Sequence, residues 1–424
     1  MKRIIGIFAI FVLCFVSSGT GFAQTSSGNL DSKAILEMYR DVVVDVETTL
    51  TVEVSGGLIL MSSVGDKFLV EISGHETEIV RMASNKLKFG GTGFFVDADG
   101  SLLTNAHVVK IPGNEINFGP FGSIRVVDYE YWVVQSEKQK KFRAELVGMN
   151  TYADNALLKV EGLDPKEFKV AKLGDSDRLA QGDVVYCYGS PYHLSGSLSD
   201  GKVSGLHRQI GLDYLEDFIQ HTASTAPGNS GSPLINGRGE VIGIHSAGIR
   251  TGASIGFAIP ASLVDVANLK TLKGGNTKLG WLGMEALLEN FDRSGDAGNP
   301  SFEDVRQLNA ATDIDDLKSL MLLANLTYPE MGVRGLKNRW AIVRDIKLGL
   351  EGNPLPAEKA EMHRGDLLMR VNDVEVQSGM DVRLALLGVA PGMSVDLQYV
   401  RTDDGAKTMK TITVVVVAKP EVEN

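Results

Sequence analysis

The segment from Gly228 to Pro233, with the sequence Gly-Asn-Ser-Gly-Ser-Pro, is the feature that most constrains how this chain can fold. A serine hydroxyl is a poor nucleophile unless a base takes its proton and hydrogen-bond donors receive the developing oxyanion. A glycine before the serine allows the sharp turn that aims two N–H groups at one point. The same residues also suit an ordinary turn. The choice between a nucleophile and a turn therefore depends on whether the chain also supplies a base and an acid.

A candidate base, His107, lies in the segment Thr104–Val109. This segment follows the apolar run Gly93–Val96 and the turn Asp97–Gly100, and an Asp-Gly pair between apolar runs predicts a hairpin. We therefore expect His107 just past the second strand of a hairpin. The alternative is an ordinary surface or hydrogen-bonded histidine, because the chain has seven histidines.

A candidate acid, Asp154, immediately precedes the apolar run Ala156–Val160, which predicts a buried strand. An acid at the end of such a strand can orient an imidazole and stabilise the imidazolium, although Asp154 could simply end a loop. The order His107, Asp154, Ser230 is that of chymotrypsin-like enzymes and differs from the orders in α/β-hydrolases and subtilisins. Three suitable contexts in this order favour a catalytic triad.

These segments resemble the HtrA/Deg family of trypsin-like serine proteases. The resemblance implies a mainly β fold, a chymotrypsin/trypsin-like double β-barrel followed by a PDZ (α+β) domain. It also implies an exported serine-type endopeptidase. The segments that carry it are Gly91–Val96, Thr104–Val109, Asp154–Val160, Pro227–Leu234 and Ile255–Pro260.

The resemblance also implies roles for individual residues. His107 would be the general base, Asp154 the orienting acid and Ser230 the nucleophile. The oxyanion hole would lie at Gly228, Asn229 and Ser230, with the N–H groups of Gly228 and Ser230 facing the oxyanion.

The substrate pocket is expected at residues shortly before the nucleophile and on a following strand. No acidic side chain occurs there, so we do not expect Arg or Lys before the scissile bond, and we expect small or medium aliphatic residues instead. The candidate substrate-binding residues are Ser224, His245, Ser246, Ala247 and Gly248.

The sequence departs from the family pattern at three places. Ser232 stands where the family usually has a second glycine. The segment Gln220–Ala226 lacks the usual Asp and Asn, and Lys110–Trp132 is interpreted as an inserted loop. None of these departures removes a catalytic group.

The N-terminus predicts a targeting segment. Lys2 and Arg3 precede the apolar run Ile4–Val16, and small residues stand at Gly21 and Ala23, so residues 1–23 are interpreted as a signal peptide cleaved after Ala23. The protein is then expected to be exported to a bacterial periplasm or cell envelope. The alternative is an uncleaved N-terminal anchor.

Cleavage after Ala23 would remove Cys14, one of two cysteines in the chain. The other, Cys187, lies among apolar residues and is interpreted as a small buried residue of a strand. An internal disulfide is therefore not expected.

The chain of 424 residues, 43% of them hydrophobic, is long enough for two or three domains. We predict a protease domain over 24–272, a linker over 273–277 and a PDZ domain over 278–418, with a helical insertion around 285–335. Within the first domain we expect an amphipathic stretch at Ile35–Tyr39. A closing helix is expected at Ala261–Leu272.

A peptide-binding loop is predicted at Trp281, Leu282, Gly283 and Met284. By resemblance to PDZ domains, its N–H groups would receive a peptide C-terminus while the peptide extends the sheet as a strand. The alternative is that Trp281 and Met284 pack at a domain junction.

Charge and motifs narrow the function further. The net charge of −11 argues against a general nucleic-acid or anionic-membrane binder. Cys-x-x-Cys and His-Glu-x-x-His motifs are absent, so no metal or organic cofactor is expected. The expected partners are unfolded or partly folded proteins, peptide C-termini and, by resemblance, further copies in a homotrimer or a multiple of it.

Three functions remain open. The first is an exported protease of envelope protein quality control, and the second is a membrane-anchored regulatory protease that cuts a specific partner. The third is a non-catalytic PDZ peptide-binding or chaperone protein.

Overall fold

The computed structural model describes most of the chain outside the N-terminus and one long central segment. The predicted signal peptide and residues 288–335 of the predicted insertion lie outside the described residues. In the described part, no helix is both long and apolar enough to cross a membrane. The described residues are 29–55, 67–72, 75–83, 85–117, 123–138, 140–210, 214–249, 255–287, 341–346, 354–363, 365–376, 379–403 and 406–419.

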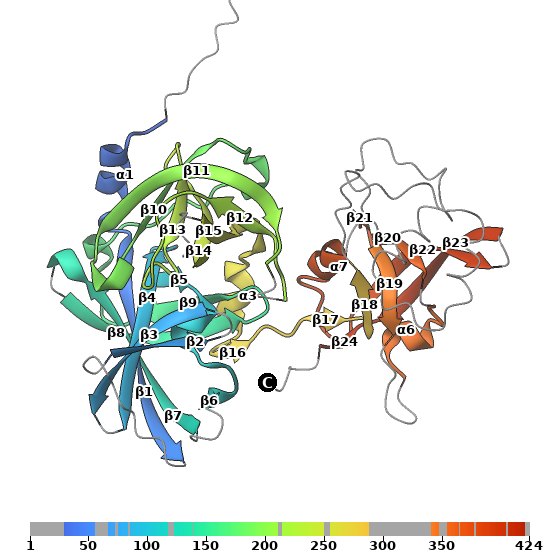
Figure 1. Ribbon diagram of the computed structural model, residues 1–424, viewed down its shortest axis with the longest axis horizontal. Helices are drawn as coiled ribbons and strands as arrows, with labels where there is room; N and C mark the ends of the chain where they lie inside the picture. Colours follow the sequence, from blue (N-terminus) through green and yellow to red (C-terminus); the bar gives the residue numbers. More distant parts are fainter. Residues whose placement is uncertain are drawn as a thin grey trace, which may run out of the picture.

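Strands within residues 43–160 form a closed barrel (Figure 1). Its strand order is β1-β7-β8-β9-β5-β4, and β1 pairs with β4 to close the ring. Two further strands, β2 and β3, extend the sheet beside β4, and β6 pairs with β7. The bounds are β1 Val43–Ser55, β2 Lys67–Ile72, β3 His75–Ala83, β4 Lys86–Phe95, β5 Ser101–Thr104, β6 Glu115–Asn117, β7 Ser123–Gln135, β8 Lys140–Asn150 and β9 Asn155–Val160.

Side-chain alternation explains why these strands form a barrel. In β1, Val44 and Val46 are buried, while Val43, Asp45 and Glu47 between them are half-buried, which is the period of two expected of a strand. β5 and β9 are buried along nearly all their length, as the sequence predicted for Ala156–Val160. The prediction of an inserted loop over Lys110–Trp132 is wrong where β6 and β7 occur.

A second closed barrel follows, with strand order β10-β11-β12-β15-β14-β13. Cys187 lies in its core, 2% exposed, as predicted, and burial raises the pKa of its thiol to about 11. The thiol therefore stays protonated at neutral pH. The bounds are β10 Val184–Gly189, β11 Ser197–Arg208, β12 Phe218–His221, β13 Pro233–Asn236, β14 Val241–Ile249 and β15 Ile255–Pro260.

Two helices pack on the barrels. The predicted stretch Ile35–Tyr39 belongs to α1 (Ser32–Tyr39), whose first turn is capped by the Asp31 carboxylate. The closing helix is shorter than predicted: Ala261–Leu263 is a 3₁₀ turn, and α3 covers Val266–Thr271. The Asp265 carboxylate caps α3 by accepting from the N–H of Asn268 at 2.9 Å, which explains where this helix begins.

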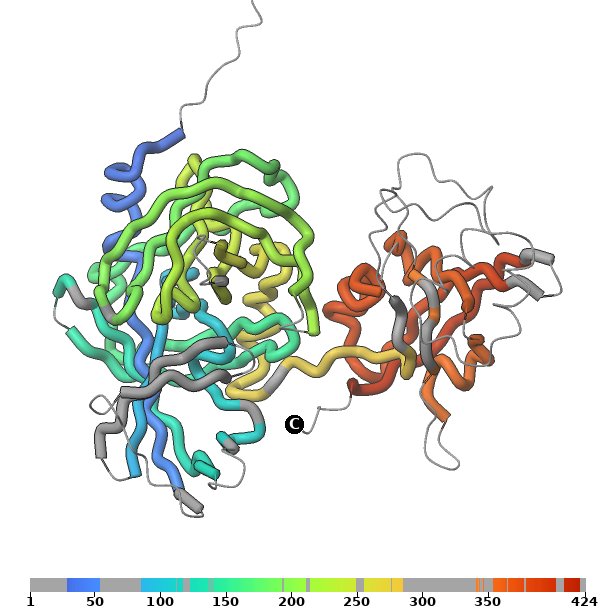
Figure 2. Tube along the Cα trace, viewed as in Figure 1, coloured from blue at the N-terminus to red at the C-terminus, as the bar shows by residue number. Residues whose placement is uncertain are grey.

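The chain then leaves α3 for a second body, along the yellow segment of Figure 2. The segment predicted as a linker is not a free tether along its whole length, because β16 (Gly275–Asn276) pairs in parallel with β8. The N–H of Thr277 also donates to the Met149 carbonyl at 2.8 Å.

The second body contains a sheet of order β18-β19-β20-β22-β23, with β21 beside β20 and a separate pair of β17 and β24. The predicted insertion around 285–335 is wrong at its start, because residues 285–287 belong to β18. The bounds are β17 Gly280–Trp281, β18 Met284–Leu287, β19 Ala341–Ile346, α6 Pro356–Lys359, β20 Leu367–Val371, β21 Val374–Glu375, α7 Gly379–Ala385, β22 Ser394–Asp403, β23 Ala406–Val415 and β24 Val417–Ala418.

A buried ion pair lies in this second body. The Arg401 guanidinium donates to both carboxylate oxygens of Asp366, at 2.8 and 2.6 Å, and to the Glu361 carbonyl at 2.8 Å. Because the side chains of Arg401 and Asp366 are 8% and 2% exposed, removal of one partner would leave the other charge buried and uncompensated.

We predict that Arg401→Met lowers the free energy of unfolding of this body by about 3–5 kcal/mol. The matched control is Arg370→Met, which removes the exposed pair between Arg370 and Glu375 and should cost below about 1 kcal/mol. Hydrogen exchange of the backbone amides of β20 measures the loss of unfolding free energy in both variants. Equal costs for the two variants would contradict the assignment of a structural role to the buried pair.

Candidate active site

His107 and Asp154 come together at one end of the first barrel. His107 lies in the short helix α2 (Ala106–Val109), directly after the β4–β5 hairpin, as predicted. Asp154 lies in the turn between β8 and β9. The His107 Nδ1 is 2.8 Å from Asp154 Oδ2, and the His107 backbone N–H donates to Oδ1 at 3.0 Å. An ionised carboxylate only accepts, so Nδ1 carries the proton and Nε2 is left as the basic nitrogen.

The Asp154 carboxylate also binds the second barrel. The Ser246 hydroxyl, from β14, donates to Asp154 Oδ2 at 2.8 Å. Asp154 is 3% exposed, and its backbone carbonyl accepts from the Asn105 side chain at 2.8 Å. Hydrogen bonds from both barrels thus compensate the desolvation of this carboxylate.

Ser230 lies in the loop between β12 and β13, and both barrels hold its backbone. The Ser230 carbonyl accepts from the Thr92 N–H at 2.8 Å, and the Gly231 N–H donates to the His245 carbonyl at 2.8 Å. Gly231 has φ +87°, and a Cβ there would lie 2.0 Å from the Thr92 carbonyl oxygen, so only glycine fits. The Ser230 hydroxyl donates to the Ser246 carbonyl at 3.3 Å.

Two hydrogen bonds fix the orientation of the peptide bond between Pro227 and Gly228. The Pro227 carbonyl accepts from the Tyr192 N–H at 2.7 Å, and the Gly228 carbonyl accepts from the Thr92 hydroxyl at 2.8 Å. In a planar trans peptide the N–H points opposite to the carbonyl, so the Gly228 N–H points away from Tyr192. Gly228 has φ +100°, a conformation that favours glycine.

Of the three predicted oxyanion residues, Asn229 uses its N–H within the loop. The Asn229 N–H donates to the Ala226 carbonyl at 3.0 Å, so it is engaged inside the loop and is not an oxyanion donor in this conformation. Ser232, which replaces the family's glycine, is fully buried, and its hydroxyl donates to the Asn229 carbonyl at 2.6 Å. The Ser232 hydroxyl therefore supports the same turn.

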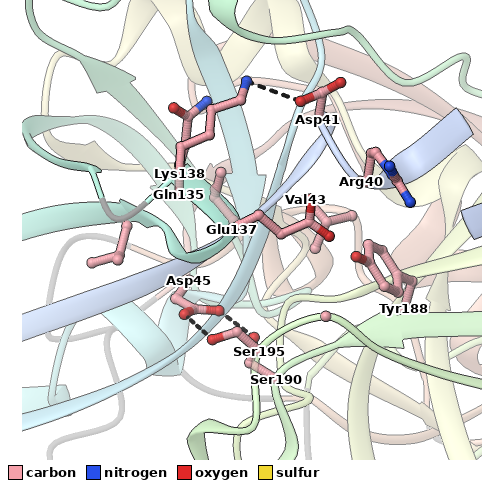
Figure 3. A pocket seen from close by; sticks show the side chains of 13 residues that line it. Arg40, Asp41, Val43, Asp45, Gln135, Glu137, Lys138, Tyr188, Ser190 and Ser195 are labelled. Carbon is pink, nitrogen blue, oxygen red and sulfur yellow. Dashed lines mark hydrogen bonds and ion pairs between the residues drawn. The ribbon is translucent and has the colours of Figure 1, made fainter. Parts of the chain in front are cut away.

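A carboxylate of the first barrel anchors the loop that contains Tyr192. Asp45, in β1, accepts hydrogen bonds from the hydroxyls of Ser190 and Ser195 (Figure 3). These residues line a cavity of about 230 Å³, at whose far side Lys138 pairs with Asp41 at 2.9 Å. None of the three candidate triad residues lines this cavity. By binding Ser190 and Ser195, Asp45 fixes the loop that contains Tyr192, and the Tyr192 N–H orients the Pro227 carbonyl.

Of the predicted substrate-binding residues, Ser224 lies in the loop between β12 and β13 that also carries Ser230, here called the nucleophile loop, and the other four lie on β14. His245 and Ser246 are buried, Ala247 is half-buried, and Ser224 and Gly248 are exposed. His245 and Ser246 contact the nucleophile loop through backbone atoms, as described for Gly231 and Ser230. Ala247 and Gly248 follow these two residues on β14, and Ser224 precedes Ser230 in the loop itself.

The sequence did not identify His221 as part of this region. His221, in β12, is fully buried, and its Nε2 is 3.3 Å from His245 Nδ1, with the rings edge to face. Burial lowers the pKa of His221 to about 4, while an interaction with the Ala223 backbone acts in the opposite direction. His221 is therefore neutral at pH 7.

We predict an acid-sensitive stability that depends on His221. An unfolded histidine titrates near pH 6.5, so the unfolded state binds the extra proton between about pH 6.5 and 4, and stability falls as the pH drops through this window. The contribution is about 3 kcal/mol. Denaturant unfolding of His221→Leu should show a correspondingly smaller loss between pH 7 and pH 4. His207→Leu, at an exposed histidine, serves as control, and equal pH profiles for wild type and His221→Leu would refute the prediction.

In the second body, the predicted peptide-binding residues border a small groove. Trp281, Leu282 and Met284 line a cavity of about 60 Å³ together with residues of α7. β18, which begins at Met284, is the outer strand of its sheet in the described part of the chain. Gly283 has φ +74°, and the Leu282 carbonyl is held by the Ala357 N–H at 2.8 Å. An outer strand beside a helix is the geometry into which a peptide strand can be added.

Tyr214 of the first body contributes to the same groove. The Arg383 side chain donates to the Tyr214 carbonyl at 3.0 Å, and its guanidinium lies 4.4 Å from the centre of the Tyr214 ring. The Lys419 ammonium lies 4.2 Å from that ring. The chain leading into β12 thus contacts the groove directly.

Comparisons with known proteins agree with this architecture. Residues 91–244 match the family model of the trypsin-like peptidase domain. A "Probable periplasmic serine endoprotease DegP-like" of Pseudomonas putida (strain GB-1) is 37% identical over 298 residues, covering 65% of this chain and 58% of the relative. A relative with the same description from Halomonas elongata is 28% identical over 428 residues, covering 98% of this chain and 76% of the relative. The chain thus spans somewhat over half the length of the first of these relatives.

Solved structures show the same fold. "HtrA-type protease AlgW with decapeptide" has a TM-score of 0.58 at 21% identity, covering 92% of this chain and all of that chain. The serine endoprotease from Yersinia pestis has a TM-score of 0.50 at 20% identity, covering 91% of this chain and 98% of that chain. The predicted fold class, mainly β with a trypsin-like double barrel, is confirmed.

Proposed function

Because this chain carries a trypsin-like peptidase domain and is related to DegP-like and HtrA-type serine proteases, we propose that it is an exported serine endopeptidase that uses His107, Asp154 and Ser230. The observation that carries the proposal is the hydrogen-bonded chain from Ser246 through Asp154 to His107. This hydrogen-bond network lies beside Ser230, a glycine-flanked serine whose loop is held by both barrels.

The chemistry follows from the protonation of His107. The Ser230 hydroxyl gives up its hydrogen bond to the Ser246 carbonyl and attacks a peptide carbonyl of the substrate. As it does so, the Nε2 of the His107 imidazole accepts its proton. Asp154 stabilises the imidazolium that forms, and the N–H groups of Gly228 and Ser230 receive the oxyanion. His107 then protonates the leaving amine, and water releases the acyl-enzyme by the same steps.

The site of action is proposed from the relatives and the N-terminal sequence. The relatives are named periplasmic, and residues 1–23 have the pattern of a secretory signal. We therefore place the protein in the periplasm or cell envelope, where it would degrade or process unfolded proteins in quality control. Assembly as a homotrimer or a multiple of it is proposed by family resemblance.

The second body is proposed to bind peptide C-termini as a PDZ domain. The N–H groups of the loop Trp281–Met284 would receive the carboxylate, and the peptide would pair with β18 opposite α7. Because Tyr214 lines this groove, a bound peptide would meet a residue of the protease body.

The nucleophile can be tested by hydrolysis of unfolded casein. We predict that Ser230→Ala lowers the rate by about 10⁶-fold, because the acyl-enzyme cannot form. Ser197→Ala is the matched control: its hydroxyl donates to the Leu194 carbonyl in an exposed hydrogen bond, and the rate should stay at the wild-type level. Full hydrolysis by Ser230→Ala would show that another residue is the nucleophile.

Carboxylate recognition can be tested with one peptide in two forms. We predict that a peptide with a hydrophobic C-terminal residue binds the full chain at least about tenfold more tightly as the free acid than as the amide. The reason is that charge-assisted hydrogen bonds to the carboxylate are lost in the amide. Fluorescence anisotropy in the Ser230→Ala background measures both affinities without cleavage. Equal affinities would exclude C-terminal carboxylate recognition.

A further inference from the structure

The buried pair of His221 and His245 lies directly beside the nucleophile loop. The backbone of His245 bonds this loop twice: its carbonyl accepts from the Gly231 N–H at 2.8 Å, and its N–H donates to the Ser232 carbonyl at 2.8 Å. The next residue, Ser246, contacts Ser230 and Asp154. A group bound at His245 would therefore be close to the residue that Ser230 attacks.

Two glycines leave room for the Thr225 side chain beside the His221 ring. Gly248 of β14 pairs with Gly256 of β15, so this pair of facing residues carries no side chain. A Cβ at Gly248 would lie 2.4 Å from Thr225 Oγ1. A Cβ at Gly256 would lie 2.7 Å from Thr225 Cγ2 and 2.3 Å from His221 Cε1. Thr225 thus packs against this glycine pair next to the His221 ring.

The side chains that meet here offer donors and no negative charge. Thr225 carries a hydroxyl, and each histidine carries an imidazole N–H. Ser224, which precedes Thr225, is also a hydroxyl residue. The carboxylate that the neighbouring Ser246 contacts, Asp154, is engaged by His107 and Ser246. A negatively charged substrate group would therefore meet hydrogen-bond donors and no opposing charge at this cluster.

On this basis, and resting on the proposed endopeptidase function, we propose that His245, positioned by His221 and aided by Thr225, selects an acidic side chain. That side chain belongs to the residue whose carbonyl Ser230 attacks. Glutamate and aspartate then replace the aliphatic residues that the sequence alone suggested, since two buried imidazoles at this position were not foreseen.

The histidine pair explains how charge can be accommodated in a buried place. His221 is neutral, so its Nε2, 3.3 Å from His245 Nδ1, can accept a hydrogen bond. When a carboxylate arrives, His245 can take up one proton from solvent. It can then donate from one ring nitrogen to the carboxylate and from Nδ1 to His221. The new positive charge is thus both paired and hydrogen-bonded, which a buried charge requires. An aliphatic side chain offers these donors no acceptor.

The test compares four peptides that differ only in the residue before the scissile bond, which is Glu, Gln, Leu or Lys. We expect kcat/KM for the Glu peptide to exceed that for the Gln and Leu peptides by at least about tenfold, because a hydrogen bond to a charged group is stronger than one to its neutral isostere. Equal values for Glu and Gln, or fastest cleavage after Leu, would overturn the proposal and leave the endopeptidase function in place. Cleavage of none of the four would overturn both.

Variants distinguish recognition from a structural role. His245→Val and Thr225→Val should each lower the ratio of kcat/KM for the Glu peptide to that for the Leu peptide by about tenfold, mainly through KM for the Glu peptide. The conservative Thr225→Ser keeps the hydroxyl and should restore most of the ratio. A fold defect lowers both rates together and leaves the ratio unchanged, so an unchanged ratio in properly folded variants would contradict the proposal.

Discussion

The buried carboxylate of Asp154 is the group on which the arrangement of the two barrels depends. It accepts from the imidazole and the backbone N–H of His107 in the first barrel and from the hydroxyl of Ser246 in the second. A carboxylate that is 3% exposed is tolerated only when such donors are present, so the three contacts are a condition of folding as well as of chemistry. The same contacts fix the tautomer of His107. The same interaction therefore contributes to stability and to the proposed catalytic orientation of His107.

The first barrel also determines the shape of a loop that belongs to the second. Thr92 binds the nucleophile loop through its N–H and its hydroxyl, to the carbonyls of Ser230 and Gly228. Asp45 holds the segment that contains Tyr192, whose N–H orients the Pro227 carbonyl. The proposed oxyanion donors thus depend on side chains far away in sequence. A change on β1 or β4 that preserves the proposed triad can still disturb the proposed oxyanion hole.

The sequence predicted the parts of the site that depend on local signals. His107 follows a hairpin turn and Asp154 precedes an apolar strand, so each could be placed from its neighbours. The strand β7 was missed because many of its residues are polar and half exposed, and the closing helix was predicted too long because Asp265 caps it late. The pairing of His221 with His245 could not be predicted, since β12 and β14 meet only across β15. Tertiary packing, which no local pattern encodes, brings these two rings together.

We infer that Asp154, His107 and Ser230 act together as one activated nucleophile. The most direct measurement is reaction of the full chain with a fluorophosphonate probe, followed by mass spectrometry of the labelled peptides. We expect one phosphonylated residue, Ser230, and much slower labelling in the Asp154→Asn variant, where the His107 tautomer is lost. Labelling of a different serine, or equally fast labelling of Ser230 in Asp154→Asn, would contradict it.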